Sequence, residues 1–449
     1  MSDSGEIRSF PIPQGWIVTT VGDVLVSIDA GKSPDCPDIP ATSGEWGVLK
    51  VSAVQPNGFK SNENKIIVNK AWINPAYEVQ DGDLLISRSN TFQLVGIVCH
   101  VRSPQPRLML CDKTLRMRVD PRRAMTDFVF WQFLQPSARR HIEVHATGTS
   151  GSMKNISQPS IRSLRIQLPP LPQQRKIARI LTTLDNVITQ TEALIAKYQA
   201  IKQGLMHDLF TRGVDATGKL RPPQSEAPEL YKQSELGWIP KEWGTSTLES
   251  LLADVPYPMR SGPFGSSLLK ADLVEQGIPY LGIDNIHPEH FCPEFRRFVS
   301  PSQFQQLQRY AVREGDVVIT IMGTVGRCCV IPDGIGNALS SKHIWTMSVA
   351  QDRYLPVLLC WQLNHSPWVL STFRGKSQGG IMDSISSTTL KTLLLPHPPI
   401  GEQREIARRY ESGTNEITLQ ELALGKFKLQ KNGLMQDLLT GKVRVNVEV

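Results

Sequence analysis

The chain has 449 residues, of which 40% are hydrophobic, and a formal net charge of +7. These values predict a soluble globular protein of two or three domains. No apolar run approaches the roughly 20 residues that span a bilayer, and the first five residues lack the charged and apolar regions of a secretory leader. A membrane protein or a secreted protein is therefore not expected.

The cysteines and the net charge further limit the class of protein to which the chain can belong. The seven cysteines are irregularly spaced, and no C-x-x-C pair occurs. This usage predicts reduced thiols in the cytoplasm and no zinc site. The pI near 9.0 is compatible with a polyanionic partner, because cations that neutralise phosphates release condensed counterions, but the excess of positive charge is mild.

Residues 1–168 form the first predicted domain, which has mixed α and β structure. Short runs rich in β-branched and apolar residues predict strands at 46–52, 82–88, 94–101, 113–119 and 164–168. The spacing of apolar residues over 127–145 predicts one helix, and a Gly/Ser-rich loop follows it at 147–155.

A long helix is predicted over residues 169–211. Pro172 stands in its first turn, and Gly213 lies just past its end. Apolar residues recur at alternating spacings of four and three, which is typical of a helix that packs against a second helix. This predicted seam comprises Ile177, Leu181, Leu184, Ile188, Ile195, Tyr198 and Leu205. Lys202 interrupts it, and a lysine there either fixes the register, reaches solvent or contacts a partner.

The rest of the chain repeats this plan. Residues 212–237, rich in Gly and Pro and short of apolar side chains, are expected to be an unpacked linker. A second mixed domain is predicted over 238–396, with a helix at 355–373, and a second long helix over 397–441, followed by a tail at 442–449. The seam of the second long helix comprises Ile406, Ile417, Leu424, Phe427 and Leu434, with Lys431 in the position of Lys202.

The two long helices are copies of one another. Their openings are Leu168-Pro-Pro-Leu-Pro-Gln-Gln-Arg-Lys-Ile-Ala-Arg179 and His397-Pro-Pro-Ile-Gly-Glu-Gln-Arg-Glu-Ile-Ala-Arg408. Their closings are Lys202-Gln-Gly-Leu-Met-His-Asp-Leu-Phe-Thr211 and Lys431-Asn-Gly-Leu-Met-Gln-Asp-Leu-Leu-Thr440, at the same offset of 229 residues. One offset at both ends indicates an internal duplication.

The order of the elements predicts how the helices pack. A parallel pair would require the linker to return along the whole helix, so an antiparallel pair is the easier closure. The predicted fold class is α+β: two mixed α/β domains separated by two long helices that form an antiparallel coiled coil, with a pseudo-two-fold internal repeat.

The chain resembles the DNA specificity subunit of type I restriction-modification systems. The resemblance lies in two unlike domains alternating with two like helices, in the Pro-Pro-x-x-x-Gln-Arg-x-Ile-Ala openings and Gly-Leu-Met-x-Asp-Leu closings of those helices, and in the Gly82-Asp-Leu-Leu-Ile-Ser strand. The resemblance covers essentially the whole chain. It implies a non-catalytic subunit whose two target-recognition domains each read one half of an asymmetric bipartite site on double-stranded DNA.

The same resemblance implies partners. The family's spacer helices hold the recognition domains apart and dock two methyltransferase subunits, and two restriction/translocase subunits join for cleavage. S-adenosylmethionine, ATP and magnesium are therefore expected on the partner subunits, with no cofactor and no metal in this chain.

Candidate DNA contacts follow from chemistry. Arg, Lys, Asn and Gln on exposed loops can read base edges, and Ser and Thr can fix phosphates. The candidates are Arg88, Asn90, Lys113, Ser150, Ser152 and Lys154 in the first domain, and Arg260, Ser261, Thr320, Thr324, Lys342, Lys376 and Gln378 in the second. Lys342 is taken as the counterpart of Lys113. The segment Arg260-Ser-Gly-Pro-Phe-Gly-Ser266 resembles a motif of some recognition domains in the family.

Two other functions stay open. Asp38, Glu63 and Lys65 loosely match the carboxylate and lysine pattern of a metal-dependent nuclease, although the second domain lacks it. The chain could also be a coiled-coil scaffold without a DNA role. His287-Pro-Glu-His290 lacks the helical i, i+4 histidine pair of a metalloprotease and is expected to be a surface loop.

Overall fold

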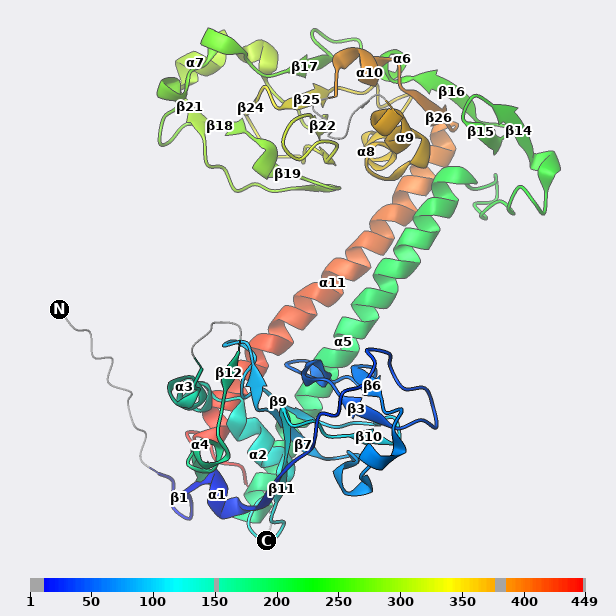
Figure 1. Cartoon of the computed structure of the whole chain (residues 1–449). Helices are drawn as coiled ribbons and strands as arrows, with labels where there is room; N and C mark the ends of the chain where they lie inside the picture. Colours follow the sequence, from blue (N-terminus) through cyan, green and yellow to red (C-terminus); the bar gives the residue numbers. More distant parts are fainter. Residues whose placement is uncertain (1–11, 149–152, 376–384, 447–449) are drawn as a thin grey trace. The chain divides into compact units, whose positions relative to one another are not determined.

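The computed structural model describes residues 12–148, 153–375 and 385–446 (Figure 1). The chain forms two compact units. Unit 1 comprises Met1–Leu194 and Gln420–Val449, and unit 2 comprises Ile195–Leu419. Each unit therefore contains one of the two mixed domains and a part of each long helix.

Unit 1 is built on two sheets that share a core. Its strands are β1 (Ile17–Thr20), β2 (Leu25–Ala30), β3 (Gly47–Leu49), β4 (Val54–Gln55), β5 (Gly58–Phe59), β6 (Asn64–Ile66), β7 (Leu84–Ser87), β8 (Ser89–Asn90), β9 (Val98–His100), β10 (Leu108–Met109), β11 (Thr114–Val119), β12 (Lys154–Asn155) and β13 (Arg165–Leu168). The larger sheet has the order β2-β11-β7-β9, and the smaller has the order β10-β3-β6.

The helices of unit 1 cover one face of the larger sheet. They are α1 (Val21–Val24), α2 (Thr126–Phe133), α3 (Pro136–His145), α4 (Gln158–Arg162) and the first part of α5 (Leu171–Thr211), joined by the last part of α11 (Ile400–Leu439). In β7, Leu84 and Ile86 pack with the core under these helices, whereas Leu85 packs with the smaller sheet. Both faces of the strand are buried, which explains its uninterrupted apolar sequence.

Unit 2 repeats this topology. Its strands are β14 (Tyr231–Ser234), β15 (Gly237–Pro240), β16 (Gly244–Thr247), β17 (Met259–Ser261), β18 (Ile278–Leu281), β19 (Ile286–His287), β20 (His290–Phe291), β21 (Phe298–Val299), β22 (Val317–Thr320), β23 (Cys328–Val330), β24 (Leu339–Ser340), β25 (Ile344–Met347) and β26 (Leu394–His397). The orders β17-β25-β22-β23 and β21-β18-β24 match the two sheets of unit 1 strand for strand.

The remaining helices of unit 2 are α6 (Leu248–Leu251), α7 (Pro301–Gln306), α8 (Pro356–His365), α9 (Pro367–Gly375) and α10 (Ser387–Lys391). Val317 and Ile319 of β22 face the core under α8 and the long helices, and Val318 faces the smaller sheet. The alternation is the same as in β7. The repeat predicted from the helix sequences therefore extends to the domains, although most of their residues differ.

Two predicted helices are in fact each divided by a proline. The expected helix at 127–145 is α2 followed by α3, and Pro136 occupies the first turn of α3. The expected helix at 355–373 is α8 followed by α9, which begins at Pro367. Proline lacks the amide hydrogen of an interior helical residue, so each helix ends before it even though the apolar spacing continues.

The expectation of an unpacked linker at 212–237 is also wrong. Val214, Ala227 and Tyr231 are buried, and the segment contains β14, which pairs with β15. The segment packs through few apolar groups and through polar contacts to α11, which its composition did not reveal.

The repeated glutamine of the helix openings has a structural role. Gln174 is buried, accepts a hydrogen bond from the backbone amide of Met125 and donates one to the carbonyl of Pro169. Gln403 makes the corresponding bonds with Leu355 and Pro398. Each glutamine thus ties the start of a long helix to the segment that begins α2 or α8, satisfying backbone groups that would otherwise be buried without partners.

The predicted seam residues lie inside the units. Ile177, Leu181, Ile188, Ile195, Ile406 and Ile417 are buried, and Leu184, Tyr198, Leu205, Leu424, Phe427 and Leu434 are half-buried. In unit 1, residues near the start of α5 share a core with Leu438 near the end of α11. In unit 2, Leu209 near the end of α5 shares a core with Ile406 near the start of α11. Among the described helices, none combines the length and hydropathy of a membrane span.

The two seam lysines point into their own units. Lys431 forms an ion pair with Asp185, and its ammonium lies 5.1 Å from the centre of the Trp131 ring. Lys202 lies 3.3 Å from a carboxylate oxygen of Glu289 and 4.5 Å from the centre of the Tyr410 ring. Each ammonium is thus held between a carboxylate and an aromatic face.

Residues 287–290 form the exposed turn of the β19–β20 hairpin, as expected of a surface loop, but the side chain of Glu289 is half-buried. Its carboxylate accepts hydrogen bonds from Lys202 of α5, Tyr410 of α11 and His365 of α8. Burial raises the pKa of Glu289, but the bonds from His365 and Tyr410 and the charge of Lys202 outweigh it and lower the pKa to about 2. The β19–β20 hairpin is thereby tied to three helices of unit 2.

Replacing Glu289 with glutamine should weaken unit 2 at pH 6 and change its acid response. A carboxyl whose pKa is lowered by folding contributes stability that is complete above its unfolded pKa, about 4.5, and is lost as the pH falls toward 2. We expect Glu289→Gln to lower the unfolding free energy by on the order of 2 to 3 kcal/mol at pH 6 and by much less at pH 2.5. Urea unfolding at both pH values measures this, with Glu294→Gln, an exposed carboxyl near the same hairpin, as the control.

Candidate nucleic-acid interface

The structure brings together four of the first-domain candidates. Arg88 follows the end of β7, and its backbone amide donates to the carbonyl of Lys113 at 2.8 Å. β8 pairs with β12 so that Asn90 lies opposite Lys154. Segments that are far apart in the sequence therefore present three cationic side chains and one amide at one edge of unit 1.

These four side chains differ in whether they already form hydrogen bonds within the unit. Arg88 and Lys113 are exposed, and neither side chain forms a hydrogen bond or ion pair with another described residue. The ammonium of Lys154 donates to the carbonyl of Gly148 at 2.6 Å, and Asn90 accepts from the amide of Thr91 at 2.9 Å. Arg88 and Lys113 can therefore bind an anion without giving up an internal contact within the described chain, whereas Lys154 and Asn90 would have to exchange one.

Unit 2 changes the expected counterpart of Lys113. The amide of Ile321 donates to the carbonyl of His343 at 2.9 Å, as the amide of Arg88 does to Lys113. Strand register therefore places His343, and not Lys342, in the position of Lys113. Burial, followed by the charges of Lys342 and Arg297, lowers the pKa of His343. Lys342 is exposed beside it and supplies the cation from the neighbouring position.

Arg260 does not face a DNA-accessible surface. Its side chain is 3% exposed, it is ion-paired with Asp316, and its guanidinium also donates to Ala311, Tyr257 and Ser348. A guanidinium with its donors used inside the domain cannot read a base edge. The expectation that Arg260 contacts DNA is therefore corrected to a structural role.

Two hydroxyl candidates of unit 2 are also internal. Thr320 is buried, and its hydroxyl accepts from the amide of Arg327 at 3.1 Å and donates to the carbonyl of Thr324. Ser261 is buried and donates to the carbonyl of Lys342 at 3.3 Å. Thr324 is half-buried in the turn that Thr320 closes. Ser150, Ser152, Lys376 and Gln378 lie outside the described residues.

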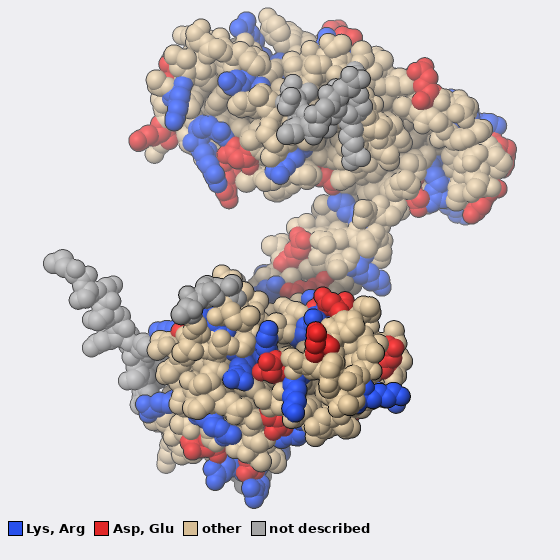
Figure 2. Space-filling view, in the orientation of Figure 1, with Lys and Arg blue, Asp and Glu red and all other residues tan. Residues whose placement is uncertain are grey.

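Net charge alone does not mark the interface. Figure 2 shows Lys and Arg interspersed with Asp and Glu over the visible face of each unit. The position of Arg88 and Lys113 is therefore a stronger indication than the formal charge of +7.

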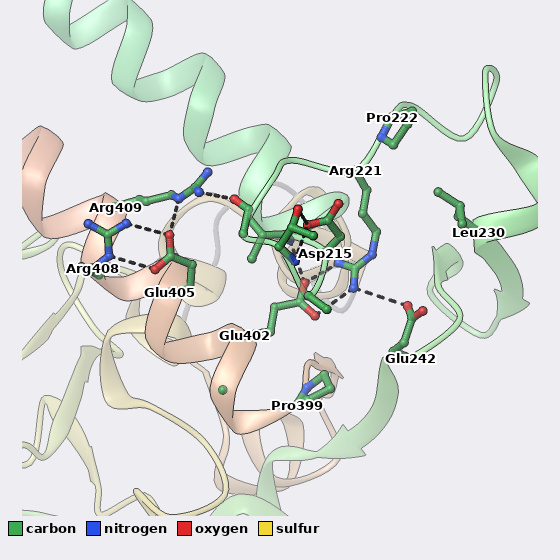
Figure 3. A pocket seen from close by; sticks show the side chains of 15 residues that line it. Asp215, Arg221, Pro222, Leu230, Glu242, Pro399, Glu402, Glu405, Arg408 and Arg409 are labelled. Atoms are coloured by element: carbon green, nitrogen blue, oxygen red, sulfur yellow. Dashed lines mark hydrogen bonds and ion pairs between the residues drawn. The ribbon is translucent and has the colours of Figure 1, made fainter.

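A cleft of about 860 Å³ lies between the start of α11 and residues 214–222 of unit 2 (Figure 3). It contains Arg221, Arg408 and Arg409, but each has a carboxylate partner. Arg221 is paired with Glu402 at 2.5 Å and with Glu242 at 3.4 Å, and both Arg408 and Arg409 are paired with Glu405 at 2.7 Å. The cleft therefore holds residues 214–222 against α11 and does not present free cations.

The nuclease alternative finds no support in the geometry. Asp38 is ion-paired with Lys50 at 2.5 Å, and Glu63 accepts a hydrogen bond from Ser52 at 2.5 Å. Within the described ranges, no group of three or more His, Cys, Asp or Glu side chains is placed to hold a metal ion.

Comparisons with known proteins agree on one family. The model of the type I restriction modification DNA specificity domain matches residues 127–203, which run from α2 into α5. A putative specificity subunit of the type I restriction enzyme MjaX from Methanocaldococcus jannaschii is 24% identical, over 97% of this chain and 95% of that protein. Over nearly its whole length this chain is similar to specificity subunits of type I restriction-modification systems.

Further specificity subunits match this chain over different lengths. The EcoEI specificity subunit of Escherichia coli is 31% identical over 210 residues, which are 45% of this chain and only 34% of that protein. The MjaVIII specificity subunit of M. jannaschii is 22% identical over 98% of this chain and 96% of the relative.

Solved structures show the same fold. The crystal structure of the specificity subunit from M. genitalium covers 95% of this chain and 96% of its own, with a TM-score of 0.58 and 14% sequence identity. A chain from a structural study of complex assembly in the type I system covers 97% of this chain and 100% of its own, with a TM-score of 0.53 and 16% identity.

Proposed function

We propose that this chain is the DNA-specificity subunit of a type I restriction-modification complex. Its mixed domains, in units 1 and 2, each read one half of an asymmetric bipartite target on double-stranded DNA. The observation that carries the proposal is the near full-length similarity to specificity subunits. The exposed Arg88 and Lys113 in unit 1, and Lys342 in unit 2, support it, because cations on exposed loops neutralise phosphates and reach base edges.

The repeated topology supports an asymmetric target. The two sheets of unit 1 recur in unit 2, but the side chains beside them differ: Arg88 is replaced by Ile321, and Lys113 by His343. Identical recognition domains would require a palindrome, whereas unlike domains on a repeated scaffold read two different half-sites.

The long helices set the spacing in this proposal. α5 and α11 each begin in one unit and end in the other. They form an antiparallel coiled coil along their length and dock two methyltransferase subunits, with two restriction/translocase subunits joining for cleavage. In this proposal the chain itself carries no catalytic site. S-adenosylmethionine, ATP and magnesium bind to the partner subunits, and the complex works in the cytoplasm.

Selection from a random duplex library by the purified chain, with its methyltransferase where needed, tests the proposal. One discontinuous sequence should be enriched. Binding without sequence preference at every salt concentration would remove the proposal, and no binding at all would leave the scaffold alternative. Methylome sequencing of the host should show adenine methylation in the same motif.

Lys113→Ala should weaken binding to the selected duplex because it removes an exposed phosphate-neutralising cation. We expect the slope of log affinity against log salt to fall by about one, with little change in sequence preference. Lys60→Ala, an exposed lysine of the same unit, is the matched control. Titration at several salt concentrations distinguishes the two variants, and equal slopes would exclude Lys113 from the interface.

One additional helical turn in both long helices should lengthen the unread gap and leave both half-sites unchanged. The insertions lie between Thr191 and Tyr198 in α5 and between Gln420 and Phe427 in α11. A turn adds about 5.4 Å, or one to two base pairs. Duplex selection with the double insertion measures the gap. A changed half-site would contradict the spacer role, and insertion in one helix alone is the control that should disrupt the pairing.

A further inference from the structure

Each unit carries a hairpin tip at the end of its central strand. In unit 1 the tip joins β7 to β9, and the amide of Gly96 closes it by donating to the carbonyl of Ser87 at 2.7 Å. In unit 2 the tip joins β22 to β23, and the amide of Gly326 donates to the carbonyl of Thr320 at 2.8 Å. Both glycines have a positive φ, so the two tips are closed in the same way.

The tips differ in length between these anchors. Residues 88–95 form the tip in unit 1 and residues 321–325 form it in unit 2, so the first is longer by three residues. Each tip exposes a large apolar side chain: Phe92 is 45% exposed in the longer one and Met322 is 46% exposed in the shorter one. The repeated topology therefore places an unburied apolar group at the same point twice.

Contacts with α3 fix the backbone of the longer tip. Arg139 donates to the carbonyls of Phe92 at 2.6 Å and Val95 at 2.8 Å, and it is ion-paired with Glu143 at 2.8 Å. Gly96 lies so close to Ile142 that a Cβ there would come within 2.5 Å of its side chain. The guanidinium of Arg139 lies 6.0 Å from the centre of the Phe92 ring, at the outer limit of a cation–π contact. The tip is therefore held in place while much of the ring remains exposed.

The surroundings of the ring indicate its partner. The exposed Arg88 begins the same tip, and its amide is bonded to the backbone of the exposed Lys113. An exposed aromatic ring on a tip that begins with an unpaired cation matches nucleic acid, in which an apolar base face lies next to a phosphate. A protein partner of this apolar surface would have to bury those cations, which is unfavourable without matching carboxylates.

We propose that Phe92 is a stacking wedge that enters the DNA duplex at a base step within the half-site read by unit 1. Apolar side chains inserted in this way partly unstack a base step, and an aromatic ring recovers stacking with a base face. Met322 occupies the corresponding place in unit 2, where its flexible chain fills space without a planar face. The inference rests on the proposed DNA-specificity function.

The test uses the full chain and the duplex that it selects, with 2-aminopurine placed in turn at each adenine of the two half-sites. Wild-type protein should raise the fluorescence at one position in one half-site. Phe92→Ala should abolish that rise and weaken binding about tenfold, because loss of one aromatic stacking partner has effects of this size. Phe92→Tyr, which keeps the ring, should retain both the signal and the affinity.

Controls separate the possible failures. Trp72→Ala removes another exposed aromatic of unit 1, 42% exposed, and should change neither the signal nor the affinity. Met322→Ala should leave the signal that depends on Phe92 unchanged. An unchanged melting temperature shows that Phe92→Ala is folded. If wild-type protein selects a sequence but Phe92→Ala retains the signal and the affinity, the wedge is wrong and the proposed function stands. If wild-type protein selects no sequence, the proposed function itself fails.

Discussion

Glu402→Ala is expected to destabilise unit 2 by about 3 kcal/mol, because the buried guanidinium of Arg221 then keeps only the longer ion pair with the exposed Glu242. The side chains of Arg221 and Glu402 are 7% and 8% exposed, and two hydrogen bonds join them. Glu402 also accepts from the backbone amide of Val214 at 2.8 Å. Removing this carboxylate therefore weakens the attachment of the segment after α5 to the start of α11, where only contacts such as that of Arg409 with the carbonyl of Gly218 remain (Figure 3).

Hydrogen exchange measured by mass spectrometry locates the effect. Amides of residues 213–222 and of the first turns of α11 should exchange much faster in Glu402→Ala, and urea unfolding gives the size of the loss. Glu405→Ala is the matched control, since Glu405 pairs with Arg408 and Arg409 at a more exposed site, where ion pairs contribute little to stability. Combining Arg221→Met with Glu402→Leu should recover part of the loss, because no buried charge then remains unpaired. Equal losses in Glu402→Ala and Glu405→Ala would contradict the role given to Arg221.

Arg260→Ala is expected to lower the unfolding free energy of unit 2 by about 3 to 5 kcal/mol, because the carboxylate of Asp316 would remain buried without its cation. The side chains are 3% and 2% exposed. Thermal and urea unfolding of the full chain measure the loss. The same variant should leave the sequence preference of the folded protein unchanged. A folded Arg260→Ala protein that selects altered bases would restore Arg260 as a DNA contact.

Unit 1 offers a compensating change for this variant. There the turn carboxylate Asp83 pairs with Arg116 of β11, and Arg116 also pairs with Asp29 of β2. By strand register, Asp29 corresponds to Arg260, and Arg116 corresponds to Thr346. The double variant Arg260→Asp with Thr346→Arg moves the cation to the neighbouring strand, as in unit 1, and should regain part of the stability that either single variant loses. No recovery would show that the two arrangements are not interchangeable.

These ion pairs show why part of the candidate site could not be predicted. Each unit has a carboxylate in its Gly-Asp turn, Asp83 or Asp316, and pairs it with an arginine, but the arginine comes from different strands. Alignment of the two repeats matches the carboxylates and misses the arginines. An arginine near a turn has the same sequence signature whether it neutralises a buried carboxylate or contacts a phosphate, so only burial distinguishes them.

The packed segment at 212–237 is a second case in which polar contacts could not be predicted from the sequence. Its composition predicts a linker, because few apolar residues are available to bury. The segment is nevertheless held by Glu402, which lies 181 residues beyond Arg221 in the sequence. Composition reports the apolar contribution to packing and cannot report a hydrogen-bonded partner so far away. The proline breaks before α3 and α9, by contrast, were visible in the sequence, but the continuous apolar spacing concealed them.

The sequence by itself determined the long helices, the duplication and the strands at 82–88 and 113–119 in the centre of the larger sheet of unit 1. Heptad spacing and the repeated openings place α5 and α11 almost at their observed bounds, because these signals are local and regular. Only the tertiary structure decided which polar residues are free. It gathers Arg88, Asn90, Lys113 and Lys154 at one edge and buries Arg260 and Thr320, and it exposes Phe92 on an anchored tip. The exposure of a side chain depends on strand register and on contacts between distant segments, and a linear pattern of residue types does not contain this information.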